Sequence, residues 1–344
     1  MLRSTCNLSL MTVLTATALM ACGDDKGTSD TAASTGGATE SPTSTTAGGT
    51  TADAPTSTTG AETTDGTTDG TTGDTTPTTG ATTMMGGETA ADGEACSANG
   101  DCMSVACLKY RDLVDGECVA APDGGATRFA GTLLDFVSGA PVPDIEVRVI
   151  GAFAALSDPV GAPAVVTGNA DADGKVDIVS PAAVDEGLGV IGIITGGDYY
   201  TSATGLASPV DGVYGPMNGN RDIWGMPTAK LTDWNGYLMG DKEIEASLPL
   251  GEKGGVVGFV RDGTGAPKAG AKVISATKAD ATTAKIRYLA ADGLSFTSDM
   301  TSSTGIFILV GPSLAEKFKV EGGTVEGTAG SAPNAVFVMI LTEP

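Results

Sequence analysis

Short runs in which apolar and polar residues alternate recur through the second half of the chain. Clear examples are "EVRVI" at 146–150, "KVDIV" at 175–179 and "IFILV" at 306–310, and turns rich in Gly, Pro and Asp separate such runs. Successive side chains of a strand point to opposite faces, so a period of two with β-branched residues predicts strands. Several short strands at regular turn spacing are typical of a β-sandwich or barrel. We therefore expect an all-β fold.

The stretch 182–245 lacks this alternation, and no long helical period is clear in it, so we expect long loops there. Five aromatic residues gather in the stretch: Tyr199, Tyr200, Tyr214, Trp224 and Trp234. Exposed aromatics stack on sugars or fill a partner's pocket, whereas buried ones anchor a core. Because only 5% of the residues are aromatic, we favour core anchors.

An internal repeat divides the region that carries the strand pattern. Residues 131–150 ("GTLLDFVSGAPVPDIEVRVI") and 258–274 ("GFVRDGTGAPKAGAKVI") share a strand that ends in Asp, a Gly-Ala-Pro turn and a second strand. The turn prolines, Pro141 and Pro267, each stand six residues before a strand valine. The likeness continues in 171–181 and 302–312, where a glycine and a proline stand seven residues apart.

Agreement at two separated places indicates two copies of one domain. Copy one spans about 126–249 and copy two about 252–344. Each copy is long enough to bury its own core. We therefore expect two β-sandwiches that fold independently.

The frame G-x-x-x-D…G-A-P…V, followed by a turn, a strand and a proline, resembles the carboxypeptidase regulatory-like domain. The resemblance spans both copies and is strongest in copy two. It implies two tandem transthyretin-like, Ig-like β-sandwiches that serve as accessory or binding modules rather than as catalysts.

The same frame, with "TSSTGIF" at 301–307, also resembles the start of intradiol ring-cleaving dioxygenases, which hold iron with two Tyr and two His. The chain contains no His, so that iron site cannot be assembled. The same absence removes Ser-His-Asp and Cys-His catalysis and the usual catalytic zinc sites. We expect no cofactor.

The amino terminus has the layout of a secretory signal. Arg3 precedes an uncharged apolar stretch that is too short to span a bilayer. The end of this stretch, "LMAC", resembles the lipobox of bacterial lipoproteins, in which the chain is cut before the cysteine and the cysteine is acylated. We therefore expect a signal peptide at 1–21 and a lipid anchor on Cys22, which places the protein in the cell envelope, outside the cytoplasm, at the outer membrane or the cell surface.

Residues 22–93 are rich in Thr, Gly and Asp and contain no Phe, Tyr, Trp, Leu, Ile or Val. Such a segment buries too little apolar surface to offset its ordering entropy, so we expect a disordered tether.

Four cysteines follow in a short module at 94–120: Cys96, Cys102, Cys107 and Cys118. An even number of cysteines outside the cytoplasm predicts two disulfides, and the spacing lacks the C-x2-C pairs of a zinc site. Four cysteines allow three connectivities, and we do not choose between them.

Acidic residues dominate the charge, which is −23 at pH 7 and disfavours nucleic acid as a partner. One calcium loop is a candidate, because the acidic residues of 169–180 fall near the positions of such a loop: Asn169, Asp171, Asp173 and Asp177. Position 12 of that loop is Ser180 rather than Glu, and the matching turn of copy two has no carboxylate. A plain β-turn explains the same residues.

These observations predict a non-enzymatic envelope lipoprotein that holds tandem binding or adhesion domains at the surface, with a surface protein or a glycan as ligand. The alternative is an extracytoplasmic hydrolase that uses a pair of carboxylates, for example on glycans. An enzyme would bring carboxylates together in a pocket, and a binding module would not.

Overall fold

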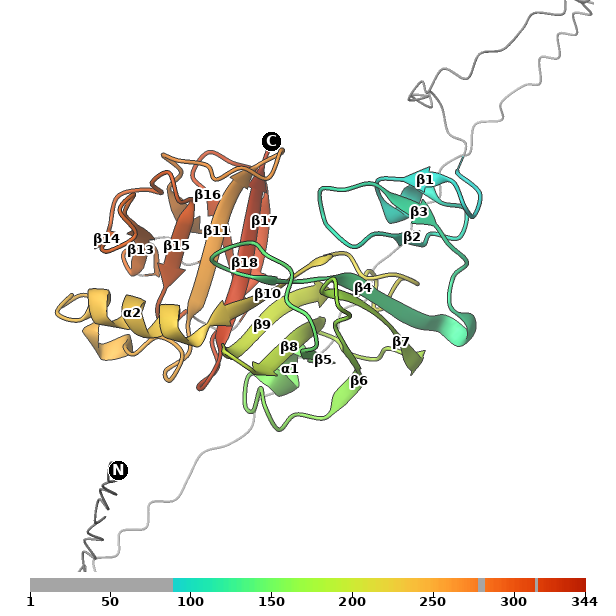
Figure 1. Ribbon diagram of the computed structural model, residues 1–344, viewed down its shortest axis with the longest axis horizontal. Coiled ribbons are helices and arrows are strands. Elements are labelled where there is room, and N and C mark those ends of the chain that lie inside the picture. Colours follow the sequence, from blue (N-terminus) through green and yellow to red (C-terminus); the bar gives the residue numbers. More distant parts are fainter. Residues whose placement is uncertain (1–88, 278–281, 313–314) are drawn as a thin grey trace, which may run out of the picture. The chain divides into compact units, whose positions relative to one another are not determined.

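Strands dominate the residues that the structure describes. These are residues 89–277, 282–312 and 315–344 of the computed structural model (Figure 1). The signal peptide, Cys22 and nearly all of the tether lie outside the described residues, so what we expect of them stays a prediction. The all-β fold class is confirmed, because paired strands account for most of the regular structure in the described part. No helix in that part is long and apolar enough to cross a membrane.

The cysteine-rich module forms a small antiparallel sheet in the order β1-β3-β2. Its elements are β1 (Ala95–Cys96), η1 (Asn99–Asp101), β2 (Cys107–Leu108) and β3 (Gly116–Cys118), with η2 (Asp123–Gly125) leading into copy one.

Copy one is a sandwich of two layers, β7-β4-β10 and β6-β5-β8-β9, which are connected at one corner where the end of β10 pairs with the start of β9. Its elements are β4 (Ala126–Asp135), β5 (Glu146–Gly151), α1 (Ala152–Ala155), β6 (Ala164–Asn169), β7 (Lys175–Ala183), β8 (Val190–Gly196), β9 (Tyr199–Ala207), β10 (Asp222–Pro227), α2 (Thr228–Leu238) and η3 (Glu245–Ser247). Phe129, Leu133, Val147 and Ile194 belong to the core between the sheets.

Copy two is also a sandwich, with β14-β13-β15-β11-β18 facing β12-β16-β17. Its elements are β11 (Val256–Asp262), β12 (Val273–Ser275), β13 (Ile286–Leu289), β14 (Phe296–Thr297), β15 (Ile306–Leu309), β16 (Glu316–Val320), β17 (Glu326–Ala329) and β18 (Val336–Glu343). Val260, Tyr288, Phe307 and Phe318 belong to its core.

The Gly-Ala-Pro frame folds in the same way in both copies. The amide of Val142 donates to the carbonyl of Leu133, and the amide of Lys268 donates to the carbonyl of Val260, each at 2.9 Å. The first strand of each copy pairs in parallel with the last, β4 with β10 and β11 with β18. The hydrogen bonds and the strand order of the frame therefore both occur twice.

Glycine at the second repeated turn has a steric reason. Gly174 and Gly305 have φ values of 76° and 66°, which L side chains rarely adopt. A Cβ on Gly174 would lie 2.9 Å from the Cβ of Pro141, and one on Gly305 would lie 2.6 Å from the carbonyl oxygen of Val260. The turn therefore packs too closely against the Gly-Ala-Pro frame to hold a larger residue.

The two copies are joined in the structure, and whether each folds alone stays a prediction. β18 of copy two pairs in parallel with β9 of copy one, with Val336 opposite Ser202 and Val338 opposite Thr204. This pairing joins one sheet of each copy into a continuous sheet, and the described residues from 89 onward belong to one compact unit. The edge of a sheet carries unpaired N–H and C=O groups. Here the hydrogen bonds between β18 and β9 pair such groups at the edge of each copy.

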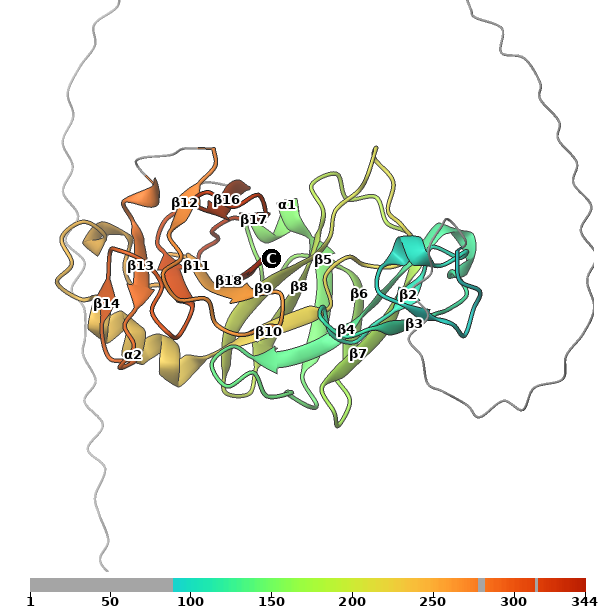
Figure 2. The ribbon, with the colours of Figure 1, turned by 90° about the horizontal axis from the view of Figure 1, so that it is seen from above.

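The expectation of long loops at 182–245 is also wrong, because β8, β9, β10 and α2 lie within it. Leu231, Trp234 and Leu238 are spaced by three and four residues, so they share one face of α2, and all three are buried. They pack in one core with Val257 and Ile308 of copy two. Figures 1 and 2 both show α2 beside the strands of copy two.

Candidate binding site

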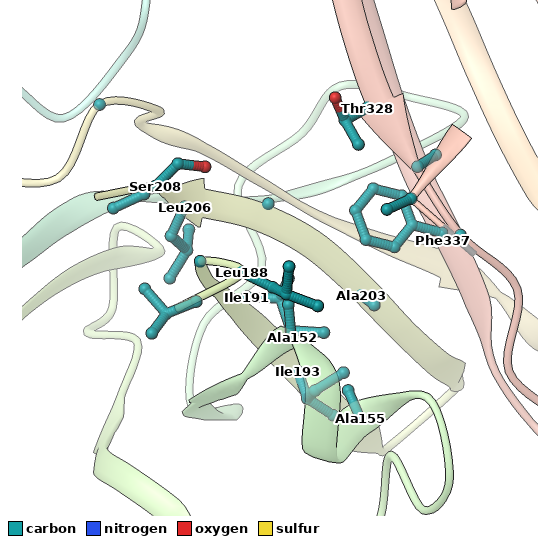
Figure 3. A pocket seen from close by; sticks show the side chains of 18 of the residues that line it. Ala152, Ala155, Leu188, Ile191, Ile193, Ala203, Leu206, Ser208, Thr328 and Phe337 are labelled. Atoms are coloured by element: carbon teal, nitrogen blue, oxygen red, sulfur yellow. The ribbon is translucent and has the colours of Figure 1, made fainter. Parts of the chain in front are cut away.

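A pocket of about 670 Å³ lies where the two copies meet. Figure 3 shows its walls, with side chains from α1, β8 and β9 of copy one and Phe337 of β18 in copy two. The segment from Thr328 to Ala332, which ends β17 and continues into the next loop, contributes further lining residues. The pocket therefore exists only because the copies are joined.

Strand β8 is apolar on both faces, which explains how it lines the pocket. Val190 and Ile194 point into the core of copy one. Ile191 and Ile193 belong to a separate cluster that includes Ala203 of β9. Successive residues of a strand alternate in direction, so Ile191 and Ile193 face the pocket, and Val190 at the start of the strand also lines it.

Small residues leave the space open. Ala152 and Ala155 of α1 and Ala203 and Gly205 of β9 line the pocket. Protein interiors are normally filled to the density of organic crystals. A hollow of this size between two packed sandwiches is therefore exceptional, and the small side chains that line it account for the space.

Exposed apolar residues border the same pocket. Val210 and Val213 exchange hydrogen bonds across a tight hairpin, and Asp211 and Gly212 between them have φ values of 51° and 80°, as in a type I′ turn. Val210 is 76% exposed, and Leu188, on a neighbouring loop, is 58% exposed. Both Val210 and Leu188 line the pocket.

One hydrogen bond holds these two loops together. The hydroxyl of Tyr214 donates to the carbonyl of Glu186 at 2.6 Å. Burial raises the pKa of Tyr214 to about 12, so its hydroxyl is neutral near pH 7. The apolar border of the pocket is therefore held by a buried, uncharged anchor.

The pocket offers little chemistry beyond binding. Its lining, as far as the structure describes it, contains no carboxylate, amine, guanidinium or thiol, and Tyr214 is its one titratable group. The other polar side chains are Asn99, Ser208, Thr328 and Ser331. Asn99 is already engaged, since its Oδ1 accepts from the amide of Cys107 at 3.2 Å. General acid–base or nucleophilic catalysis needs a base beside the reacting group, and none lines this pocket.

A second hollow, of about 650 Å³, contains Asp222, Arg111 and Arg261. Asp222 accepts from Nε of Arg111 at 2.8 Å, from the amide of Asp112 at 3.2 Å and from Nη1 of Arg261 at 2.8 Å. Its carboxylate thus accepts three hydrogen bonds, from the cysteine-rich module and copy two. Asp112 lies close by, and burial together with the charge of Asp222 raises its pKa. This cluster ties three segments together, and both oxygens of Asp222 are engaged in it.

The candidate calcium ligands do not converge. Oδ1 of Asp171 accepts from the amides of Asp173 and Lys175 within its own turn, and Asp177 forms a two-pronged pair with Arg128 at 2.7 Å. Asp173 is exposed beside Lys175, and Asn169 ends β6. The carboxylates of 169–177 thus cap a turn and pair with a neighbouring strand.

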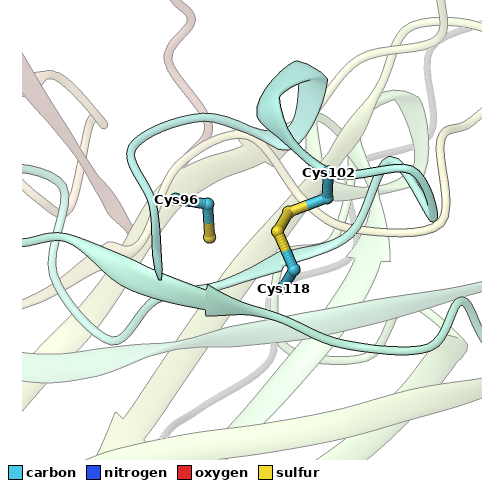
Figure 4. A group of neighbouring side chains, drawn as sticks. All are labelled: Cys96, Cys102 and Cys118. Carbon is cyan, nitrogen blue, oxygen red and sulfur yellow. A yellow bond between two sulfur atoms is a disulfide. The ribbon is translucent and has the colours of Figure 1, made fainter. Parts of the chain in front are cut away.

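The structure contains the two predicted disulfides, with the connectivity Cys96–Cys107 and Cys102–Cys118. Figure 4 shows Cys96 beside the Cys102–Cys118 bridge. The sulfurs of Cys96, Cys102 and Cys118 lie within 4.8 Å of one another, the one metal-like grouping in the described part of the chain. Because these sulfurs are oxidised, the grouping is two packed disulfides.

The aromatic residues are mainly core anchors, as we favoured. Trp224, Trp234 and Tyr214 are at most 8% exposed. The rings of Trp224 and Trp234 both pack edge-on against Phe136, with centroids 6.0 and 6.3 Å away. The two indoles are therefore not available for stacking on a sugar.

Sequence reasoning missed the residues that line the pocket. Ile191, Ile193 and Ala203 lie in the stretch expected to be loops, and Phe337 lies in a strand expected to serve copy two alone. One signal was present, because "VIGII" at 190–194 is apolar at successive positions, as in a strand buried on both faces.

Comparisons with known proteins do not assign a family. No protein-family model matches the chain, and no curated protein matches it. The resemblance to the carboxypeptidase regulatory-like domain therefore stays a prediction.

Solved structures with partial likeness include the shaft pilin SpaA from Lactobacillus rhamnosus GG, at 12% identity over 64% of this chain and 98% of that chain, with a TM-score of 0.20. A streptococcal ancillary pilin matches at 10% identity over 69% of this chain and 73% of that chain, also with a TM-score of 0.20. The minor pilin of Streptococcus agalactiae matches at 10% identity over 63% of this chain and 96% of that chain, with a TM-score of 0.17. Likeness at this level carries no conclusion about function.

Proposed function

We propose that the chain is a non-enzymatic binding protein of the cell envelope, attached through a lipid on Cys22 and displayed outside the cytoplasm. The tether at 22–93 separates the anchor from the joined sandwiches, which bind a ligand at the pocket between them. The two disulfides support an oxidising compartment, because such bonds persist outside the cytoplasm.

The observation that carries the proposal is the contrast between the pocket and the carboxylates. The pocket is lined by apolar side chains and a few hydroxyls. The carboxylates of Asp222, Asp177 and Asp241 instead pair with arginines. A hydrolase would need two carboxylates on either side of a substrate, so this arrangement favours binding over the hydrolase alternative.

The test of the non-enzymatic part is turnover by the purified protein of a panel of glycosides and esters. We expect rates equal to those of the buffer blank. A rate above the blank that disappears when one carboxylate is replaced, for example in an Asp112→Asn protein that circular dichroism shows to be folded, would support the hydrolase and contradict the proposal.

The test of the anchor is metabolic labelling with a fatty acid, followed by membrane fractionation. We expect Cys22→Ser to abolish the label and to release the protein from the membrane. Cys6→Ser is the matched control and keeps both, because Cys6 lies within the expected signal peptide. A Cys22→Ser protein that remains labelled and membrane-bound would contradict the lipid anchor.

A further inference from the structure

We infer that the pocket between the copies takes an uncharged, long-chain lipid, with the acyl chain against its apolar walls and the polar head at the hydroxyls of Ser208 and Thr328. This inference rests on the proposed binding function and specifies the class of ligand.

The residues that line the pocket indicate that the ligand is uncharged. A charge buried without a partner is strongly unfavourable, and the lining residues supply no opposite charge. The part of the ligand that enters is therefore neutral. The walls of Ile191, Ile193 and Phe337 offer it apolar contact.

The volume fits one chain-like molecule. A pocket of about 670 Å³ lies in the usual range of small-molecule sites, roughly 300–1,000 Å³. Ala152, Ala155 and Ala203 line it from two elements, and a larger apolar residue at any of these positions would occupy the space. A ligand with a long apolar body makes the contacts that these small residues leave unmade.

The two loops that form the mouth of the pocket expose apolar side chains, whereas exposed loops are usually polar. Leu188 and Val210 line the pocket and are 58% and 76% exposed. Neighbouring Val213 is 68% exposed on the same hairpin. Contiguous exposed apolar residues mark interaction sites, and here they extend the pocket outward. An elongated ligand covers both the pocket and this border.

Two exposed hydroxyls in the lining indicate the chemistry of the polar head of the ligand. The side chains of Ser208 and Thr328 line the pocket and are exposed, and they form no hydrogen bond with another residue that the structure describes. Hydroxyls both donate and accept, so they suit a neutral ester, amide or alcohol head. A monoacylglycerol has these properties, whereas a fatty acid or a cationic amphiphile carries a charge that no lining residue neutralises.

The experiment is displacement of the uncharged fluorophore N-phenyl-1-naphthylamine from the purified full-length Cys22→Ser protein, used so that no attached lipid competes. Competitors are 1-monopalmitoylglycerol, palmitate and hexadecyltrimethylammonium, all kept below their aggregation concentrations. We expect the neutral lipid to displace the fluorophore at concentrations at least about tenfold lower than either charged competitor.

Pocket variants tie the binding to the site. Ala203→Phe fills the pocket, and we expect it to weaken binding of the neutral lipid at least about tenfold. Ala172→Phe makes the same change on an exposed turn and should bind as the parent does. If Ala203→Phe fails to fold, the double variant Leu188→Ser/Val210→Ser tests the mouth instead. Leu294→Ser, at a residue 62% exposed elsewhere, is its control.

Two outcomes would overturn the inference while the binding function stands. These are equal displacement by charged and neutral lipids, and attachment to phosphatidylcholine vesicles that is lost in the mouth double variant without any displacement of the fluorophore. Unchanged binding in the pocket variants would contradict both the inference and the pocket as the binding site. Hydrolysis of the monoacylglycerol by the protein would instead contradict the proposed function itself.

Discussion

Nη1 of Arg261 in copy two donates to Oδ2 of Asp222 in copy one at 2.8 Å, and the two side chains are only 5% and 1% exposed. Arg111 of the cysteine-rich module donates to the other oxygen of the same carboxylate. One buried aspartate thus joins three segments that are separate in sequence. Because a buried charge is stable only when it is paired, this contact requires the copies to stay together.

Removing this carboxylate should strongly destabilise the fold. We expect Asp222→Ala to lower the free energy of unfolding by ~3 kcal/mol, because the buried guanidinium of Arg261 then keeps only the longer ion pair with Asp112, at 3.3 Å. Asp177→Ala is the control. Its ion pair with Arg128 is about a quarter to a third exposed, and its loss should cost ~1 kcal/mol or less. Urea denaturation followed by circular dichroism measures both, and similar losses in the two variants would contradict the structural role of Asp222.

Copy two should not fold on its own. Residues 252–344 lack α2 and β9, so the fragment exposes Val257 and Ile308 on one face of its sheet and the outer edge of β18. We expect this fragment to show no cooperative urea transition. A fragment of 228–344 restores α2 and should show a larger β-type signal and less aggregation by size-exclusion chromatography. A sharp two-state transition for 252–344 alone would show that the junction is dispensable.

Two glycines with similar backbone conformations should respond differently to alanine. Gly293 and Gly305 have φ values of 70° and 66°. A Cβ on Gly293 meets nothing within 4 Å, whereas one on Gly305 would lie 2.6 Å from the carbonyl oxygen of Val260. We expect Gly293→Ala to cost ~1 kcal/mol from the backbone alone and Gly305→Ala roughly 3 kcal/mol or more. Thermal and urea unfolding compare them, and equal costs would mean that the turn relaxes away from β11.

The stability contributed by Asp241 should depend on pH. Arg287 donates to both carboxylate oxygens of Asp241, at 2.6 and 3.2 Å, and these bonds hold the pKa of Asp241 below its usual value of 3.8. A lowered folded-state pKa means that the stabilisation is present above pH 3.8 and is lost as the pH falls through the lowered value.

We therefore expect Asp241→Asn to be less stable than the parent at pH 7 and the difference to shrink between pH 4 and pH 2. Urea unfolding across this range measures it. Asp233→Asn, which removes an exposed partner of Lys230 on α2, is the control and should change little at any pH. A deficit in Asp241→Asn that stays constant as the pH falls would show that Arg287 does not act through the charge of Asp241.

Much of the local structure could be predicted from the order of the residues. The runs at 146–150, 175–179 and 306–310 correspond to β5, β7 and β15, because a period of two reports which face of a strand is buried. Strands β8 and β9 escaped prediction, since both of their faces are covered and their residues do not alternate. Helix α2 was not predicted because only three of its residues, Leu231, Trp234 and Leu238, are buried, and three positions give a weak helical period.

Sequence alone therefore determined the all-β class, the two copies of the Gly-Ala-Pro frame, the need for glycine at their turns and an even set of cysteines for disulfides. These are properties of short segments, in which sterics and periodicity act over a few residues. Tertiary structure alone decided that β18 pairs with β9, that Asp222 meets Arg261, and that Ile193 and Phe337 line one pocket. Pairing of strand edges and burial of charges depend on which distant segments meet, and backbone groups at a sheet edge are alike in every strand, so local sequence carries no signal that selects the partner.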